Sequence, residues 1–120
     1  INGAGGRMGQ RLVALAKEDG GLKVVAALDA PGSPALGRDA GELAGVGPVG
    51  VPVVAELPLE PRPECVIDFS APAGTMAVLP VCVARKIPLV VATTGHTDAQ
   101  KAEIEAAAHL TAVLFAPNMS

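Results

Sequence analysis

The chain has 120 residues, of which 50% are hydrophobic and 2% aromatic, and a formal net charge of −3. This length allows one domain with a buried core, but not a dinucleotide domain together with a separate substrate domain. The acidic balance and the scarcity of aromatic side chains exclude a basic or base-stacking surface, so nucleic acid is not expected as a partner.

A glycine-rich turn, Gly3-Ala4-Gly5-Gly6-Arg7-Met8-Gly9, opens the chain. Its spacing predicts the turn between a first parallel strand and a first helix, where a dinucleotide pyrophosphate binds. Glycine is needed at Gly3 for a sharp turn, at Gly6 for close approach of the phosphate and at Gly9 for packing of the helix. Free N–H groups and the helix dipole then attract the anion, which would also stabilise the Arg7 cation. The alternative is a flexible glycine turn without a ligand.

The first helix and the second strand follow this turn. The helix is predicted by an apolar stripe of Met8, Leu12, Leu15 and Ala16. The apolar run 22–28 predicts a buried strand that ends at Asp29, twenty residues after Gly9. This separation is typical of the acid that hydrogen-bonds the adenosine ribose hydroxyls, and we predict that role for Asp29. The alternative is an ordinary polar residue that closes a strand.

The residues after Asp29 bear on the choice of cofactor. Ala30 and Pro31 are not basic, so the usual arginine partner of a 2′-phosphate is missing from that position. We therefore expect NAD or NADP as the cofactor, with a preference for NAD. Arg7 is the only nearby candidate for holding NADP.

The rest of the chain alternates between predicted strands and helices. Residues 31–50 form a long connection rich in glycine and proline, expected to be mobile. Ser70 is expected to cap the third helix, and Thr97 with Gln100 forms the capping box of the fourth. Helices are predicted over 39–44, 72–86 and 98–108, and strands over 51–55, 65–69, 89–94 and 112–115. This alternation predicts an α/β fold: a Rossmann-like, doubly wound, mainly parallel open sheet with helices on both faces.

Polar residues gather at the predicted carboxyl ends of the strands, where ligands of such a sheet bind. Besides the glycine turn and Asp29, the cofactor contacts predicted there are Phe69, Ser70, Thr93, Thr94, Ala116, Pro117, Asn118 and Met119. Thr and Asn side chains can hold a nicotinamide carboxamide and ribose without adding charge, and Phe69 can pack against the cofactor. As alternatives, Ser70 is a plain helix cap, Thr93-Thr94 are β-branched strand residues, and Asn118 forms a turn.

The cysteines and histidines indicate structural roles. Cys65 and Cys82 lie in apolar stretches and are expected to be small buried hydrophobes, without a disulfide or a metal set. His96 could approach the cofactor, but we interpret it as an exposed loop histidine, and His109 as a helix-end residue. No catalytic residue and no metal site is predicted. No apolar run reaches the ~18 to 20 residues that cross a bilayer and no signal segment is visible, so a cytoplasmic protein without membrane contact is expected.

Taken together, these motifs resemble the dihydrodipicolinate reductase family, over essentially the whole chain. The resemblance is carried by Gly3 to Gly9, Leu36 to Gly45, Asp68-Phe69-Ser70, Thr93-Thr94-Gly95 and Ala116 to Ser120. It implies reduction of 4-hydroxy-tetrahydrodipicolinate by NAD(P)H, in lysine and diaminopimelate biosynthesis. The cofactor contacts that it implies are Gly3 to Met8, Asp29, Ala92-Thr93-Thr94 and Ala116 to Met119. The basic residue that often follows the acid in the family is Ala30 here.

The resemblance also implies a second domain. The family's catalytic residues, in a His-His-x-x-Lys stretch, follow the position of Ser120, and the same domain builds a tetramer. The chain is therefore expected to be the incomplete dinucleotide-binding domain, 1–120, of a homotetrameric enzyme whose missing domain holds a small dicarboxylate substrate. Alone it should bind NADH weakly and turn over nothing. Two alternatives remain: the cofactor domain of another two-domain dehydrogenase, related to aspartate or homoserine dehydrogenase, and a module that senses NAD(H) without chemistry.

Overall fold

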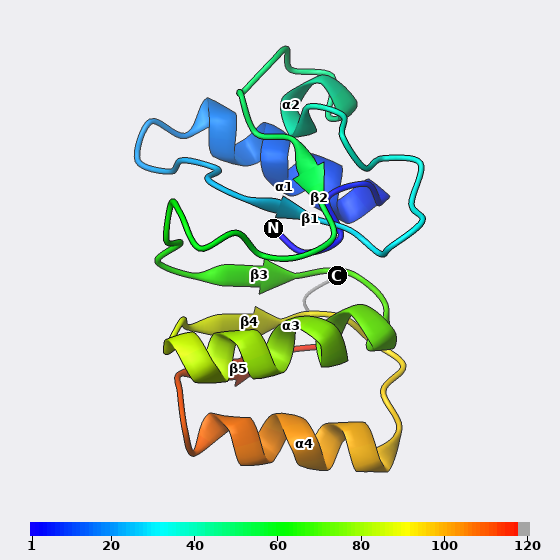
Figure 1. Ribbon diagram of the computed structural model, residues 1–120, viewed down its shortest axis with the longest axis vertical. Coiled ribbons are helices and arrows are strands. Elements are labelled where there is room, and N and C mark those ends of the chain that lie inside the picture. Colours follow the sequence, from blue (N-terminus) through cyan, green and yellow to red (C-terminus); the bar gives the residue numbers. More distant parts are fainter. Residues whose placement is uncertain (118–120) are drawn as a thin grey trace.

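The computed structural model describes residues 1–117, in which helices and strands alternate (Figure 1). The helices are α1 Arg7–Glu18, α2 Ala40–Leu43, α3 Pro72–Arg85 and α4 Asp98–Ala108. The strands are β1 Ala27–Leu28, β2 Val53–Val54, β3 Val66–Asp68, β4 Leu89–Val91 and β5 Val113–Phe115. Each predicted helix is present, and the predicted strands are present in shortened form.

The strands form a parallel sheet in two parts, β2-β1 and β3-β4-β5. Asn2 joins the two parts because it forms parallel bridges with Leu28 on one side and Asp68 on the other. From Asn2 the chain builds the sheet outward to β2, and from β3 it builds in the opposite direction to β5. Since parallel crossovers are right-handed, this reversal puts α1 on one face and α3 with α4 on the other (Figure 1). The predicted doubly wound, mainly parallel fold is confirmed.

Two hydrophobic clusters hold the layers together, and they differ in the size of their side chains. The cluster under α1 is built mostly from small residues, including Ala4, Ala27 and Ala40 around Val13 and Val53. The cluster under α3 and α4 is larger and contains Val66, Val78, Leu79, Ile87, Leu89, Val91 and Ile104. Each Val, Leu or Ile buried in this way stabilises the fold by ~1.5–3 kcal/mol. The second cluster therefore carries more of the stability.

Two strands are shorter than predicted because neighbouring groups take other partners. The run 22–28 pairs only at Ala27–Leu28, since Val51 and Pro52, which precede β2, pair with the loop around Asp39. Strand β4 ends at Val91 and not at Thr94, where the chain turns towards α4. The stripe predicted for α1 is also partly wrong: Leu15 is 48% exposed, while Gly9 and Val13 face the core.

The connection between β1 and β2 is organised around the carboxylate of Asp39. Its two oxygens accept five backbone N–H groups, from Gly41, Glu42, Val49, Gly50 and Val51. These bonds, that from Val49 foremost, lower the pKa of the Asp39 carboxyl. One side chain thus ties the helical turn to the segment before β2, and the mobility predicted for residues 31–50 stays a prediction.

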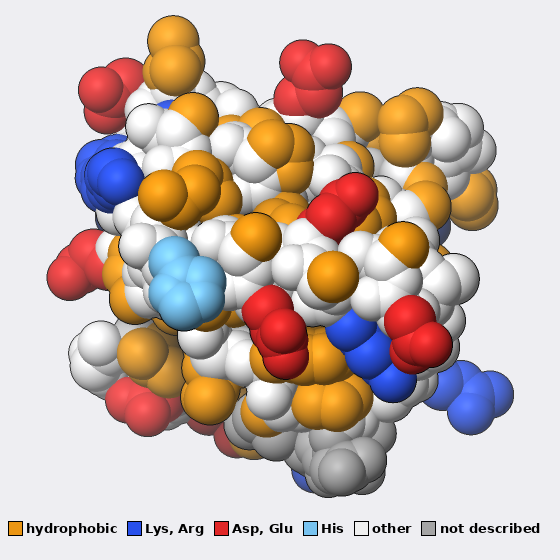
Figure 2. All heavy atoms as spheres, turned by 90° about the horizontal axis from the view of Figure 1, so that it is seen from below, with side chains coloured by type: hydrophobic (Ala, Val, Ile, Leu, Met, Phe, Trp, Pro, Cys, Tyr) orange, Lys and Arg blue, Asp and Glu red, His pale blue; other side chains and the backbone are white. Residues whose placement is uncertain are grey.

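The helix ends confirm one prediction and correct another. The capping box of Thr97 and Gln100 is present at the start of α4. Ser70 does not cap α3: the cap residue is Ala71, and the Ser70 hydroxyl bonds Asp68 instead. Charged and apolar side chains are interspersed on the end of the molecule that α4 forms (Figure 2). Within residues 1–117, no helix is long and apolar enough to cross a membrane.

The two cysteines differ in exposure. Cys82 in α3 is fully buried, and its burial raises the pKa of the thiol to about 11. Cys65 was predicted to be buried but is exposed, because it lies before β3 at the amino end of the strand. Both thiols are free.

Candidate cofactor-binding site

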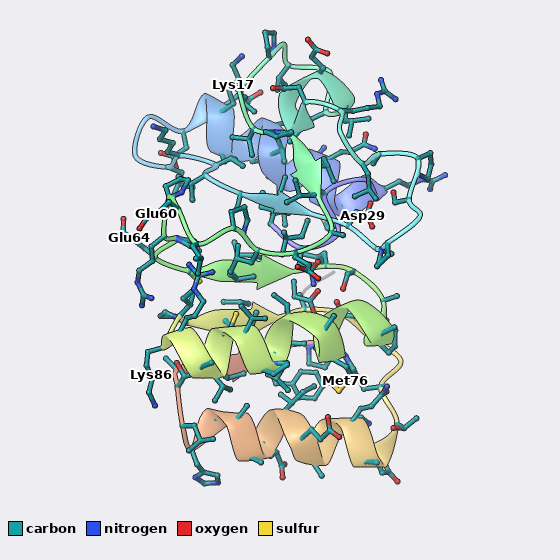
Figure 3. The ribbon with its side chains drawn as sticks, in the orientation of Figure 1. Lys17, Asp29, Glu60, Glu64, Met76 and Lys86 are labelled. Carbon is teal, nitrogen blue, oxygen red and sulfur yellow. The ribbon has the colours of Figure 1, made fainter. Side chains whose placement is uncertain are left out.

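A cleft of about 730 Å³ opens at the carboxyl edge of the sheet, where the strand order reverses. Its walls are the glycine turn (Gly3, Gly6), the residues after β1 (Asp29, Ala30, Pro31), those after β2 (Ala55, Glu56, Leu57), the β3–α3 turn (Phe69, Ser70, Ala71) and the apolar face of α3 (Ala73, Ala77, Val81). Figure 3 shows Asp29 on the side towards which the strand arrows point, with Lys86 and Glu64 on the opposite side. The cleft therefore lies where a doubly wound sheet binds its ligand.

The glycines of the turn are required for two different reasons, the packing of the fold and open space on the cleft wall. A Cβ on Gly9 would lie 1.9 Å from the Gly3 oxygen, and a Cβ on Gly3, whose φ is +91°, would lie 2.2 Å from the Phe69 oxygen. Both positions need glycine for the fold itself. A Cβ on Gly6 would meet only the Gly3 oxygen, at 3.4 Å. The missing side chain at Gly6 thus leaves open space on the cleft wall, as the predicted approach of a phosphate requires.

Most backbone N–H groups of the turn are already used inside the chain. The N–H groups of Gly3 and Ala4 donate to Leu28 O, and that of Gly6 donates to Gly3 O. The side chain of Ala4 is also fully buried in the core. The free donors predicted here therefore belong to the first turn of α1, at Arg7 and Met8, because its cap residue has no side chain to satisfy them. An anion at this helix start would find N–H groups that have no partner among residues 1–117, and the positive end of the dipole.

Asp29 is held in place by neutral donors. Its Oδ2 accepts Gly5 N at 3.1 Å and Ser33 Oγ at 3.3 Å, and its Oδ1 accepts Ala30 N at 2.8 Å. A carboxylate has about four acceptor positions, so three bonds leave room for a ligand hydroxyl. Because the side chain is half-buried on the cleft wall, it meets the geometric requirement for the ribose contact predicted from its spacing.

A second aspartate, Asp68, lies fully buried under the cleft floor and was not predicted as a site residue. Its oxygens accept Asn2 Nδ2 at 3.1 Å, Ser70 Oγ at 2.5 Å and Thr75 Oγ1 at 2.5 Å. One carboxylate thus joins the residue before the glycine turn, the β3–α3 turn and the first turns of α3. The signal in the sequence was a charged residue within the apolar run 65–69, since a buried charge requires partners.

The residues predicted on the nicotinamide side divide between core and surface. Ala92 and Thr93 are buried, and Thr94 is exposed. The hydroxyl of Thr93 accepts Ser70 N at 2.8 Å and donates to Asp68 O at 3.2 Å, so it joins β3 to β4. Ala116 and Pro117 follow β5 and do not line the cleft. Asn118 and Met119 lie outside the described residues.

His96 corrects the prediction of an exposed loop histidine, because it is 7% exposed. Its Nε2 lies 2.9 Å from Thr75 Oγ1, and its ring meets Phe115 edge-on with centroids 5.6 Å apart. Its Nδ1 is buried and has no hydrogen-bond partner among residues 1–117. His109, by contrast, is the exposed C-cap of α4, as predicted.

The class of protein is defined by three features that lie around one cleft: a doubly wound parallel sheet, a glycine turn before α1 and an acidic residue after the next strand. These are the features of NAD(P)-binding Rossmann domains. The model of one family, described as "Dihydrodipicolinate reductase, N-terminus", matches residues 1–119. The chain belongs to this family, and the resemblance in its motifs is confirmed.

Several curated relatives are similar to the whole chain. It is 42% identical over 120 residues to the 4-hydroxy-tetrahydrodipicolinate reductase of Bordetella parapertussis, covering 44% of that protein. It is 45% identical over 121 residues to the enzyme of the same name from Methylococcus capsulatus, covering 45%. It is 46% identical over 122 residues to that of Rhizobium meliloti, covering 44%. The chain thus spans less than half the length of these relatives.

Proposed function

We propose that this chain is the cofactor-binding domain, 1–120, of a 4-hydroxy-tetrahydrodipicolinate reductase. The observation that carries the proposal is the cleft at the strand reversal, which brings Gly6 and Asp29 to one edge within a chain of this family. The protein that contains the chain would transfer a hydride from NAD(P)H to 4-hydroxy-tetrahydrodipicolinate and form tetrahydrodipicolinate. The same reading implies lysine and diaminopimelate biosynthesis, a cytoplasmic location and a homotetramer.

In this proposal each segment at the carboxyl edge of the sheet has one task. The start of α1, with Arg7 and Met8, receives the pyrophosphate, and Asp29 accepts the adenosine ribose hydroxyls. The apolar face of α3 offers a surface for the adenine ring. Phe69, Ala92-Thr93-Thr94 and Ala116 to Met119 remain the predicted nicotinamide side. The cofactor itself supplies the hydride, so the chain's task is to hold it and to present one face of the ring to a second domain.

The charges along the cleft favour NAD over NADP. The charged side chains that line it are Asp29 and Glu56, with no Lys or Arg beside them in the described part of the wall. A 2′-phosphate would add negative charge close to these carboxylates. Ala30→Arg is expected to raise the affinity for NADPH relative to NADH by about tenfold, because it supplies a charge-assisted bond. An unchanged ratio would contradict this account of cofactor choice.

The proposal is tested by binding and by turnover. Since the chain has no Trp or Tyr, NADH fluorescence can be followed without protein emission. The chain is expected to bind NADH saturably. Asp29→Ala should weaken that binding, whereas Glu103→Gln, a control on the exposed face of α4, should not. The full-length protein is expected to oxidise NADH only with 4-hydroxy-tetrahydrodipicolinate. Absence of saturable dinucleotide binding would sink the proposal.

The alternatives are less well supported. An aspartate or homoserine dehydrogenase relative and an NAD(H)-sensing module would both use the same cleft, but the family model and the relatives carry the reductase name. Turnover of aspartate semialdehyde in place of the dicarboxylate would favour the first alternative. Binding of NADH by the full-length protein with no turnover of either substrate would favour the second.

A further inference from the structure

We propose that Asp68, Thr75 and His96 form a positioning relay that holds the turn between β4 and α4 against the nicotinamide half of the bound dinucleotide. The inference rests on the proposed function, since it assumes a dinucleotide in the cleft. It concerns buried side chains that have no part in the cofactor contacts proposed above. Their exposures are 0% for Asp68, 0% for Thr75 and 7% for His96.

The relay is a line of two hydrogen bonds between three elements. Thr75 Oγ1 in α3 lies 2.5 Å from Asp68 Oδ2 at the end of β3 and 2.9 Å from His96 Nε2 in the β4–α4 turn. Asp68 is also held by Asn2 and Ser70, so its position is fixed independently of the turn. The line therefore runs from a fixed anchor to the segment that it positions.

The direction of the hydrogen bonds follows from the single proton of the Thr75 hydroxyl. This proton goes to the Asp68 carboxylate at 2.5 Å, because the other two acceptors in reach, His96 Nε2 at 2.9 Å and Ala71 O at 3.5 Å, are more distant and carry no negative charge. The Thr75 oxygen must then accept from His96, so Nε2 carries a proton, and in the neutral ring Nδ1 has the lone pair. A threonine between carboxylate and imidazole thus fixes one tautomer of His96 and the orientation of its ring.

The positioned turn is held at both ends. At its start, the Thr93 hydroxyl bonds Ser70 N and Asp68 O, and at its end His96 is held by Thr75 and by the ring of Phe115. Between these points lie the exposed Thr94 and Gly95, whose φ is +90°. The relay therefore determines where the exposed segment Thr94-Gly95 stands at the carboxyl edge.

The test compares two ligands that share the adenosine half. NADH reaches the nicotinamide side, whereas ADP-ribose does not, so a positioning role affects only NADH. Thr75→Val breaks the line at nearly constant volume, and Thr75→Ser restores the hydroxyl. We expect Thr75→Val to weaken NADH binding about fivefold to tenfold and ADP-ribose binding less than about twofold, as loss of one hydrogen bond implies. Thr75→Ser should bind both ligands nearly as the wild type does.

A second variant and a spectroscopic measurement test the relay even if Thr75→Val does not fold. His96→Phe keeps a ring against Phe115 but removes the bond to Thr75, and it should show the same selective loss of NADH affinity. Nitrogen-15 shifts of the histidine rings, of which the chain has two, should assign the proton of His96 to Nε2. Equal loss for both ligands, no loss in either variant, or a proton on Nδ1 would overturn the relay. If the wild type binds neither ligand, the proposed function fails and the relay with it.

Discussion

Asp29 directly follows β1 and Asp68 is the last residue of β3, and these two parallel strands flank Asn2, but the surroundings of the two aspartates differ. Asp29 is half-buried on the cleft wall and is held by two backbone N–H groups and one hydroxyl, which leaves acceptor capacity for a ligand. Asp68 is fully buried and is held by three side chains from three segments. The same residue type at the same edge of the sheet thus keeps acceptor capacity for a ligand in one half and joins the framework in the other. What separates the two roles is whether the lone pairs are filled from within the chain.

The largest expected difference between the two aspartates is in stability. Asp68→Ala removes the acceptor of one Asn2 Nδ2 hydrogen and the nearest acceptor of the Thr75 hydroxyl, and each such loss costs ~1–3 kcal/mol. The free energy of unfolding should therefore fall by about 3 kcal/mol or more, against about 1 kcal/mol for Asp29→Ala. Urea unfolding followed by circular dichroism measures both. If Asp68→Ala does not fold, Asp68→Asn should still show the larger loss, and equal losses would remove the distinction.

The glycine turn offers the same comparison between framework and ligand. Gly9→Ala puts a methyl group 1.9 Å from the Gly3 oxygen, so the helix must shift, at a cost of about 2 kcal/mol or more. Gly6→Ala meets no atom closer than 3.4 Å and should change stability by less than about 1 kcal/mol. Its methyl group occupies the space on the cleft wall, so NADH affinity should fall at least about tenfold. Wild-type stability of Gly9→Ala, or wild-type NADH affinity of Gly6→Ala, would contradict this distinction between the two glycines.

Asp29 should matter for binding more than for folding. Hydrogen bonds to a charged group contribute ~1.5–3 kcal/mol, so Asp29→Ala is expected to weaken NADH binding about tenfold to hundredfold. Titration by NADH fluorescence gives the value, with Glu103→Gln as the matched control. Affinity within twofold of the wild type would mean that the ribose is held elsewhere.

The smallest effect concerns Asp39, a carboxylate whose partners are all backbone N–H groups. Its pKa is lower in the folded state, so its contribution is present above the pKa of the unfolded chain and is lost as the pH falls through the lowered folded value. Asp39→Asn should therefore be less stable near neutral pH and should lose less stability in acid than the wild type. Unfolding curves between about pH 7 and pH 3 test this, and parallel curves for the two proteins would contradict it.

Local patterns in the sequence determined the fold class and half of the site. Alternating apolar runs and helical stripes predicted the doubly wound sheet, and the twenty residues between Gly9 and Asp29 predicted that the turn and the acid lie on one edge. The capping box at Thr97 was predictable because its partners are three residues apart. Such features depend on spacing along the chain, which a sequence contains directly.

The errors have a common cause, because they concern side chains whose surroundings depend on which groups the tertiary structure buries. Ser70 looks like a helix cap until Asp68 turns out to be buried beside it, and His96 looks like a loop residue until α3 brings Thr75 against it. The burial predicted for Cys65 was wrong because an apolar run does not show which of its residues lie at the exposed end of the strand.

The sequence by itself determined which elements form and which residues stand at the strand ends, since helical and strand periodicity and turn chemistry act over a few residues. Only the tertiary structure decided which of those polar groups remain free for a ligand. The N–H groups of Gly3 and Ala4 are bound by Leu28 O once the sheet has closed. The carboxylate of Asp68 is bound by Asn2, Ser70 and Thr75, of which Asn2 lies 66 residues away. Each polar group can form only a limited number of hydrogen bonds, and the fold determines whether their partners come from the chain or from a ligand.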